Sequence, residues 1–221
     1  MFLMLGLSFL EIVLGVLCLM LTWKWGKRKY ERLIEVEGAI RKLKYPEYGE
    51  MLLKKYRVDF KLKPGLGNIG GICDFAKKEI RLTHKPGVMS FDAFWEVAHE
   101  VGHAVNGQFI FAKNKVLLSF ICLTIIISFV TGLKSNSLWI PILWLPIILL
   151  VCICRWRDEV RASEFAAAEL TKEIGPYLPA TRLALDRIYL AMESASIALL
   201  LMGGLMFFYY ATLNYAALMG V

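Results

Sequence analysis

The chain has 221 residues, and 57% of them are hydrophobic, against about 45–50% in soluble domains, which excludes an ordinary soluble globule. The formal net charge is +7, but the basic residues form no arm and accompany no nucleic-acid motif, so nucleic acid is not an expected partner. The five cysteines are odd in number and include no C-x-x-C pair, so neither a disulfide framework nor a cysteine zinc site is predicted.

The first apolar block, residues 2–23, is long enough to cross a membrane, which takes about 20 residues of helix. No basic region precedes it and no small-x-small cleavage site ends it, so we predict an uncleaved anchor in segment 1–23. Glu11 lies in the middle of this span, where an ionisable group indicates either a functional residue or a protonated or paired glutamate packed against another helix.

Three further apolar blocks follow later in the chain. Residues 116–133 and 138–154 are separated by a short polar turn, which predicts a membrane hairpin over 116–154 with both ends on one side. A block at about 194–217, within segment 191–221, predicts a fourth span with Gly203-Gly204 as a close-packing point.

The basic residues predict the orientation of these spans. Of the 26 Lys and Arg residues, 19 lie in segment 24–115 and six in segment 155–190, and only Lys134 falls on the other side. By the positive-inside rule, both polar segments are cytoplasmic and both termini face outward.

Segment 24–115 begins with helical spacing over 29–44 and 47–56, interrupted at Pro46, and continues with a strand at 57–62. The next loop contains G-x-G-x-x-G, but no βαβ unit surrounds it, so a nucleotide site is not predicted. Residues 72–75 and 79–83 then predict a hairpin. This hairpin either packs against the domain or offers a strand edge to an extended substrate chain.

Ser90 is placed to cap a helix that runs to Gly107, with apolar residues on one stripe. This helix carries His99-Glu100-Val101-Gly102-His103, an H-E-x-x-H motif. Residues four apart stack on one helix face, so the two imidazoles can bind one Zn²⁺. Glu100 is placed to act as general base toward a zinc-activated water that attacks a peptide carbonyl.

A catalytic zinc usually takes three protein ligands, and the other histidine, His84, lies in a Pro-Gly loop typical of a surface residue. The preferred third ligand is Glu159, because the small residues that follow it on its helix face would let the helix approach Gly102 closely. Asp158 and Glu164 remain weaker alternatives. The membrane hairpin explains how a separation of 56 residues between His103 and Glu159 can close.

The motifs H-E-V-G-H-A-V and Glu159-Val-Arg-Ala162-Ser163, with the order of spans, resemble the YugP-like bacterial membrane zinc metallopeptidases, relatives in style of the HtpX-like gluzincins. The resemblance implies zinc ligands His99, His103 and Glu159, with Glu100 as general base. Ser163 stands where HtpX-like proteins have an aspartate that orients a ligand histidine. No residue clearly matches a transition-state stabiliser; nearby donors are Arg161, Tyr177 and Arg182.

The resulting prediction is an α+β membrane protein, mainly helical, with four transmembrane helices and a small cytoplasmic zincin-like domain that carries a short β-sheet. The expected partners are the lipid bilayer and membrane-protein or peptide substrates, and the expected location is a bacterial cytoplasmic membrane. The polar residues of the H-E-x-x-H helix argue against an intramembrane protease. A non-enzymatic membrane adaptor with a structural metal is the alternative from another functional class.

Overall fold

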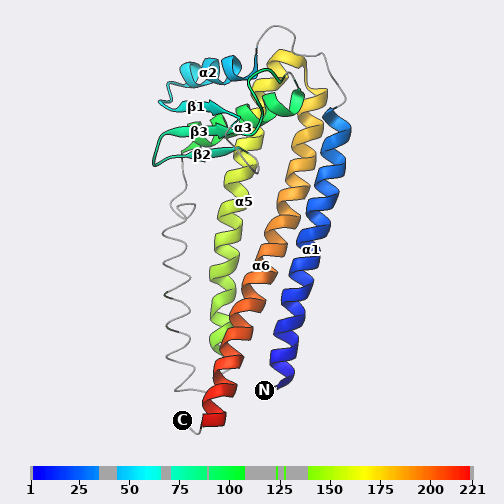
Figure 1. Cartoon of the computed structure of the whole chain (residues 1–221), viewed down its shortest axis with the longest axis vertical. Helices are drawn as coiled ribbons and strands as arrows, with labels where there is room; N and C mark the ends of the chain where they lie inside the picture. The colour runs from blue at the N-terminus through cyan, green and yellow to red at the C-terminus, as the bar shows by residue number, and fades with distance from the viewer. Residues whose placement is uncertain are drawn as a thin grey trace. The chain divides into compact units, whose positions relative to one another are not determined.

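The structure is a computed structural model that describes residues 2–34, 44–65, 71–88, 90–107, 139–219 and the helical Leu123 and Ile127. It is mostly helical with one three-stranded sheet, which confirms this part of the predicted fold class. The elements, coloured along the chain in Figure 1, are α1 (Phe2–Ile34), α2 (Tyr45–Tyr56), β1 (Lys61–Pro64), β2 (Ile72–Asp74), β3 (Glu79–Leu82), α3 (Phe91–Asn106), α5 (Trp139–Ile174) and α6 (Tyr177–Met219).

The described residues divide into two compact units. Unit 1 draws on Met1–Lys24, Phe109–Trp156 and Ala191–Val221, and unit 2 on Trp25–Gln108 and Arg157–Leu190. The first arm of the predicted membrane hairpin, 116–133, lies outside the described residues apart from Leu123 and Ile127.

Two helices are long and apolar enough to span a membrane. They are Leu3–Thr22 of α1, with mean hydropathy 2.4, and Tyr177–Tyr215 of α6, with mean hydropathy 1.8. Only 11% and 22% of their most apolar windows are buried, whereas the core helix of a soluble protein is mostly buried. Large hydrophobic side chains on the unit 1 part of these helices are exposed instead, among them Leu3, Phe9, Leu21, Phe208 and Leu218.

Within unit 1, α1 and α6 pack through glycine. A Cβ added at Gly203 would lie 3.0 Å from both Glu11 Cβ and the Ile12 backbone nitrogen, and one added at Gly15 would lie 2.8 Å from Leu200 Cγ. Among the described residues nothing lies within 4 Å of a Cβ added at Gly204, so within this part of the chain the contact is made by the first glycine of the predicted Gly203-Gly204 pair. Such small residues let helix backbones approach closely in a bilayer.

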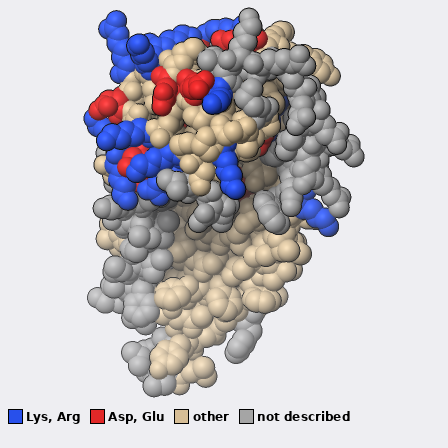
Figure 2. Space-filling view, turned by 45° about the horizontal axis from the view of Figure 1, so that its top comes forward, with Lys and Arg blue, Asp and Glu red and all other residues tan. Residues whose placement is uncertain are grey.

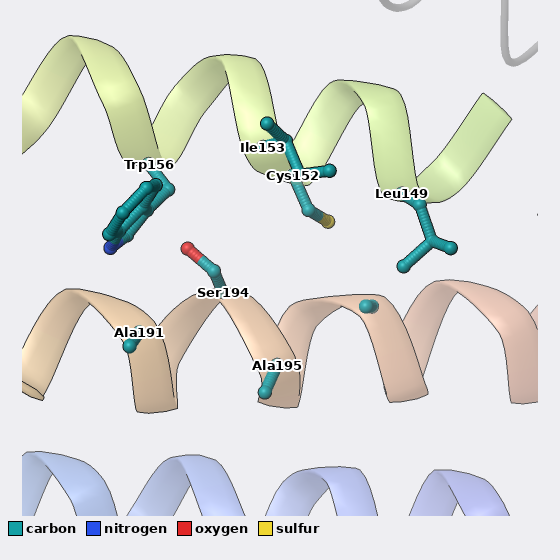
Figure 3. A pocket seen from close by; sticks show the side chains of 8 residues that line it. Leu149, Cys152, Ile153, Trp156, Ala191, Ser194 and Ala195 are labelled. Atoms are coloured by element: carbon teal, nitrogen blue, oxygen red, sulfur yellow. The ribbon is translucent and has the colours of Figure 1, made fainter. Parts of the chain in front are cut away.

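An apolar groove of about 230 Å³ lies between α5 and α6 in unit 1. Figure 3 shows Leu149, Cys152 and Trp156 of α5 pointing toward α6, from which Ser194 points back across the groove. Its lining is almost wholly apolar. The groove exists because alanine and serine on α6 leave space that the larger α5 side chains do not fill.

Several predicted helix limits differ from the structure, among them the start of the last span, expected at about 194 but found within a helix that begins at Tyr177. The first span was expected to end near residue 23, but α1 continues to Ile34, and α5 continues through Pro146 to Ile174. Neither junction contains a proline, so a continued helix keeps backbone groups paired that a break would leave open. Pro46, expected to interrupt a helix, lies in the first turn of α2, where its missing N–H costs nothing.

Unit 2 is built on the sheet, whose strand order is β1-β3-β2, with β1 parallel and β2 antiparallel to β3. Its β2–β3 pair is the predicted hairpin, shortened by one residue in each strand. The core lies between α2, α3 and the sheet, where the Tyr48 and Phe94 rings are 5.7 Å apart and Ile80 and Leu82 are fully buried. Figure 2 shows Lys, Arg, Asp and Glu side chains gathered over α2 and the sheet.

Candidate metal centre

Helix α3 carries the H-E-x-x-H motif and has the predicted limits. The Ala93 backbone N–H donates to Ser90 Oγ at 3.2 Å and caps the first turn, and Gly107, with φ 73°, ends the helix. A buried stripe anchors α3 in the core of unit 2 and so fixes the rotation of the helix: Phe94, Val97, Ala98 and Val101. His99 and His103, four residues apart, therefore project from one defined face.

Helix α5 approaches this face at Gly102. A Cβ added at Gly102 would lie 3.0 Å from the Ala162 carbonyl oxygen and 3.1 Å from Phe165 Cδ1, so any larger residue would separate the two helices. Ala162 and Ala166, on the facing side of α5, are fully buried. This is the close approach that the small residues after Glu159 predict, and it brings Glu159 to the histidines.

Three ligand atoms meet at this contact. His99 Nε2 lies 3.2 Å from both His103 Nε2 and Glu159 Oε2, and His103 Nε2 lies 3.5 Å from Glu159 Oε2. Tetrahedral zinc with bonds of about 2.0–2.1 Å places neighbouring ligand atoms about 3.3 Å apart. The donor triangle therefore has the size and chemistry of one face of a zinc tetrahedron, and the group could hold a metal ion.

The other nitrogen of each ring also has a partner. His99 Nδ1 is 3.2 Å from Ser163 Oγ, and His103 Nδ1 is 3.5 Å from Asp158 Oδ2. Hydrogen bonds of this kind orient metal-ligating histidines and hold Nε2 toward the ion. Asp158, one of the weaker ligand candidates, thus contacts a histidine from behind and does not join the donor triangle.

The electrostatics of the cluster suit a cation. Burial raises the pKa of Glu159, but the histidine hydrogen bonds outweigh burial and hold this pKa well below its usual range. Burial lowers the pKa of His103, yet its bonds to Asp158 and Glu159 raise it to about 10. Without a metal the cluster thus holds a proton, which a divalent ion would displace on binding.

Glu100 lies beside the donor triangle on α3 and is buried. Burial raises its pKa, while the nearby His99 and His103 act in the opposite direction. A Cβ added at Gly71, just before the edge strand β2, would lie 2.6 Å from Glu100 Cγ and 2.7 Å from its Oε1. The residue that precedes strand β2, at an edge of the described sheet, therefore lies against the Glu100 carboxylate.

The remaining residues considered from sequence lie outside the triangle. Glu164 pairs with Arg187 at 2.6 Å, and His84 Nδ1 is 2.7 Å from Glu96 Oε2. Arg182 binds Asp92 and Asp186 at 2.8 and 3.1 Å. Arg161 is exposed, and Tyr177 is 81% exposed.

Sequence reasoning missed Asp186 of α6. Its side chain is buried and accepts hydrogen bonds from Trp95 Nε1 at 3.0 Å and Ser163 Oγ at 3.1 Å. The one local signal was its position four residues after Arg182, which predicts a helical ion pair and no contact with the metal site.

Comparisons of the chain with models of protein families, with curated proteins and with solved structures found no match. The geometry of the site carries the functional argument.

Proposed function

We propose that the chain is an integral membrane zinc metallopeptidase that hydrolyses peptide bonds of membrane or membrane-proximal proteins. The observation that carries this proposal is the donor triangle of His99, His103 and Glu159 with the carboxylate of Glu100 beside it. Two imidazoles and one carboxylate are a donor set of catalytic zinc sites.

Zinc is favoured over other ions by the ligand atoms. Calcium and magnesium prefer oxygen ligands, whereas imidazole suits zinc and related transition metals. Among the described residues, no fourth His, Cys, Asp or Glu joins the group, so one tetrahedral position is left for water or substrate. When bound, zinc lowers the pKa of a coordinated water and polarises a carbonyl oxygen.

The residues of the chain itself supply the proton transfers and the placement of the substrate. Glu100 accepts a proton from the attacking water and delivers one to the leaving amine, and the pKa-raising effect of its burial suits a group that must take up a proton. Among the described strands β2 lies at an edge of the sheet, and this edge is placed to pair with an extended substrate chain. Because Gly71 brings this edge against Glu100, a peptide bound there passes the general base.

The membrane part of the proposal has four spans and a zincin-like domain on the cytoplasmic side. Two helices that are long and apolar enough support it, together with the 19 basic residues of segment 24–115 under the positive-inside rule. Substrates would accordingly be presented at the cytoplasmic face of the membrane.

A non-enzymatic adaptor with a structural metal is the competing function. Structural zinc sites are usually closed by four protein ligands, and only three meet in the described part of this chain. The adaptor also gives no role to a carboxylate buried beside the ligands.

The test compares purified wild type in detergent with Glu100→Gln and Glu159→Ala for zinc content and cleavage of an unfolded protein. Wild type should hold one zinc per chain and cleave. Glu100→Gln should keep the zinc and lose about 10²–10⁴-fold in rate, the usual cost of removing a general base. Glu159→Ala should lose both. Normal cleavage by Glu100→Gln would reject the mechanism, and zinc without cleavage in wild type would favour the adaptor.

A further inference from the structure

A buried hydroxyl links the metal cluster to a third helix. Ser163 of α5 is fully buried, and its Oγ lies 3.2 Å from His99 Nδ1 and 3.1 Å from Asp186 Oδ2 of α6. The chain of contacts therefore runs from the metal ligand through a serine to the carboxylate of Asp186.

The chemistry of the three groups fixes the direction of both hydrogen bonds. A carboxylate only accepts, and a serine hydroxyl has one proton to donate. Ser163 must then donate to Asp186, and it can only accept from His99. A His99 ring that offers its Nε2 lone pair to a metal ion carries its proton on Nδ1, the atom from which Ser163 accepts.

The carboxylate of Asp186 is itself held in place. Trp95 Nε1 donates to Oδ2 at 3.0 Å, and Arg182 Nε donates to Oδ1 at 3.1 Å. Arg182 also binds Asp92 in the first turn of α3 at 2.8 Å. The acceptor is thus oriented from α3 and from its own helix, and Ser163 meets it from α5.

We propose that Asp186, acting through Ser163, is a positioning residue that sets the tautomer of His99 and thereby the affinity of the metal site. This inference rests on the proposed zinc site and adds a residue to it. His103 needs no such relay, because Asp158 faces its Nδ1 directly. Partners of this kind typically change metal affinity by about 10–100-fold.

The test measures the zinc dissociation constant of metal-stripped protein in detergent by competition with a chelating indicator. Ser163→Ala and Asp186→Asn should each weaken zinc about 10–100-fold. An asparagine can donate to the serine and turn its proton toward His99, which favours the wrong tautomer. Thr171→Val is the matched control: it removes a hydroxyl of the same helix that binds the Ala167 carbonyl and lies outside the relay, so its zinc affinity should stay close to that of wild type.

The double variant separates a relay from a structural role. Once Ser163 is alanine, Asp186→Asn should weaken zinc no further, because the two residues act on His99 as one unit. Additive losses in the double variant, or an equal loss in Thr171→Val, would overturn the proposal and leave Asp186 as a packing residue.

A second measurement keeps the relay testable apart from the zinc site. Ring ¹⁵N chemical shifts of His99 are measured in metal-free Glu159→Ala, which removes the carboxylate that faces Nε2. They should show the proton on Nδ1 and a shift toward Nε2 when Asp186→Asn is added. A proton on Nε2 in Glu159→Ala alone would overturn the relay. If wild type binds no zinc, the proposed function fails, while these shifts still decide the relay.

Discussion

Unit 1 and unit 2 satisfy their buried polar groups in opposite ways. In unit 1 the buried hydroxyls of Ser8, Thr22 and Ser196 each donate to the carbonyl four residues earlier in the same helix, at 2.7–2.8 Å. A bilayer supplies no water to polar groups, so a hydrogen bond within the same helix satisfies a buried hydroxyl without any other partner.

In unit 2 the buried polar groups bind partners far along the chain. Trp95 donates to Asp186, 91 residues away, and Tyr56 donates to Glu169, 113 residues away. Such contacts tie α3 to α6 and α2 to α5 within unit 2, and a metal site needs helices that are fixed in this way. A change in unit 2 should therefore reach the site, whereas a comparable change in unit 1 should stay local.

The largest expected difference comes from the same substitution at two helical glycines. Gly102→Val should weaken zinc more than about 100-fold and destabilise the chain by about 3 kcal/mol, because the new side chain overlaps Ala162 and moves Glu159 away. Gly204→Val in unit 1 meets nothing within 4 Å and should leave zinc affinity unchanged. Zinc titration and thermal unfolding in detergent measure both, and equal effects would contradict the contrast.

Removal of the metal should act on unit 2 alone. At zinc concentrations about 100-fold above the dissociation constant, binding stabilises the folded state by about 2.7 kcal/mol. Chelation should therefore speed amide exchange in α3 and in residues 158–163, and leave Leu3–Thr22 unchanged. Exchange that rises equally in both regions, or in neither, would contradict a metal site confined to unit 2.

Glu169 predicts an acid-sensitive contact in unit 2. Burial raises its pKa, but hydrogen bonds from Lys172, Lys55 and Tyr56 outweigh it and bring the pKa to about 2. A lowered folded-state pKa stabilises above the ordinary value of 4.5, and that stability is lost as the pH falls from there toward 2.

The size of this effect is modest because Lys55 and Lys172 are solvent-exposed. Glu169→Gln should cost about 1 kcal/mol at pH 7 and flatten the loss of thermal stability between pH 5 and about 2.5. The exposed pair Arg187–Glu164 supplies the control, since Glu164→Gln should leave the pH profile almost unchanged. A wild-type profile that is flat over this range would refute the assignment.

The smallest effect is expected for Ser8→Ala in unit 1. Its hydroxyl binds only the Met4 carbonyl of its own helix, so its loss should cost no more than about 0.5 kcal/mol. Thermal unfolding in detergent measures it, with Ser163→Ala as the unit 2 counterpart. A loss above about 1.5 kcal/mol would show that Ser8 has a role beyond its own helix.

Local signals were enough to predict the helix of the H-E-x-x-H motif. The serine cap, the apolar stripe and Gly107 predict Phe91–Asn106, and α3 has these limits. The strands β2 and β3 begin and end within one residue of their predicted limits. Strand β1 begins at Lys61 and not at Arg57. Such features depend on neighbours in sequence, which is why they are readable there.

A contact between distant segments was predictable from sequence where a run of small residues on one helix face indicated close packing. The small residues after Glu159 indicated a close helix approach, and the structure shows it at Gly102. Asp186 left no comparable trace, because its pairing with Ser163 depends on how α5 and α6 pack within unit 2. The roles of His99, His103, Glu159 and Glu100 in binding and catalysis stay predictions.

The contact at Gly102 also bears on which ions the site can accept. Because main-chain atoms of Ala162 lie against Gly102, the backbones of the two helices cannot come closer, and they carry the three ligating side chains at this separation. Its edges of 3.2–3.5 Å suit ions with bonds near 2 Å, whereas calcium needs about 2.3–2.6 Å and six to eight oxygens. A backbone contact between two helices would in this way discriminate between ions by their size.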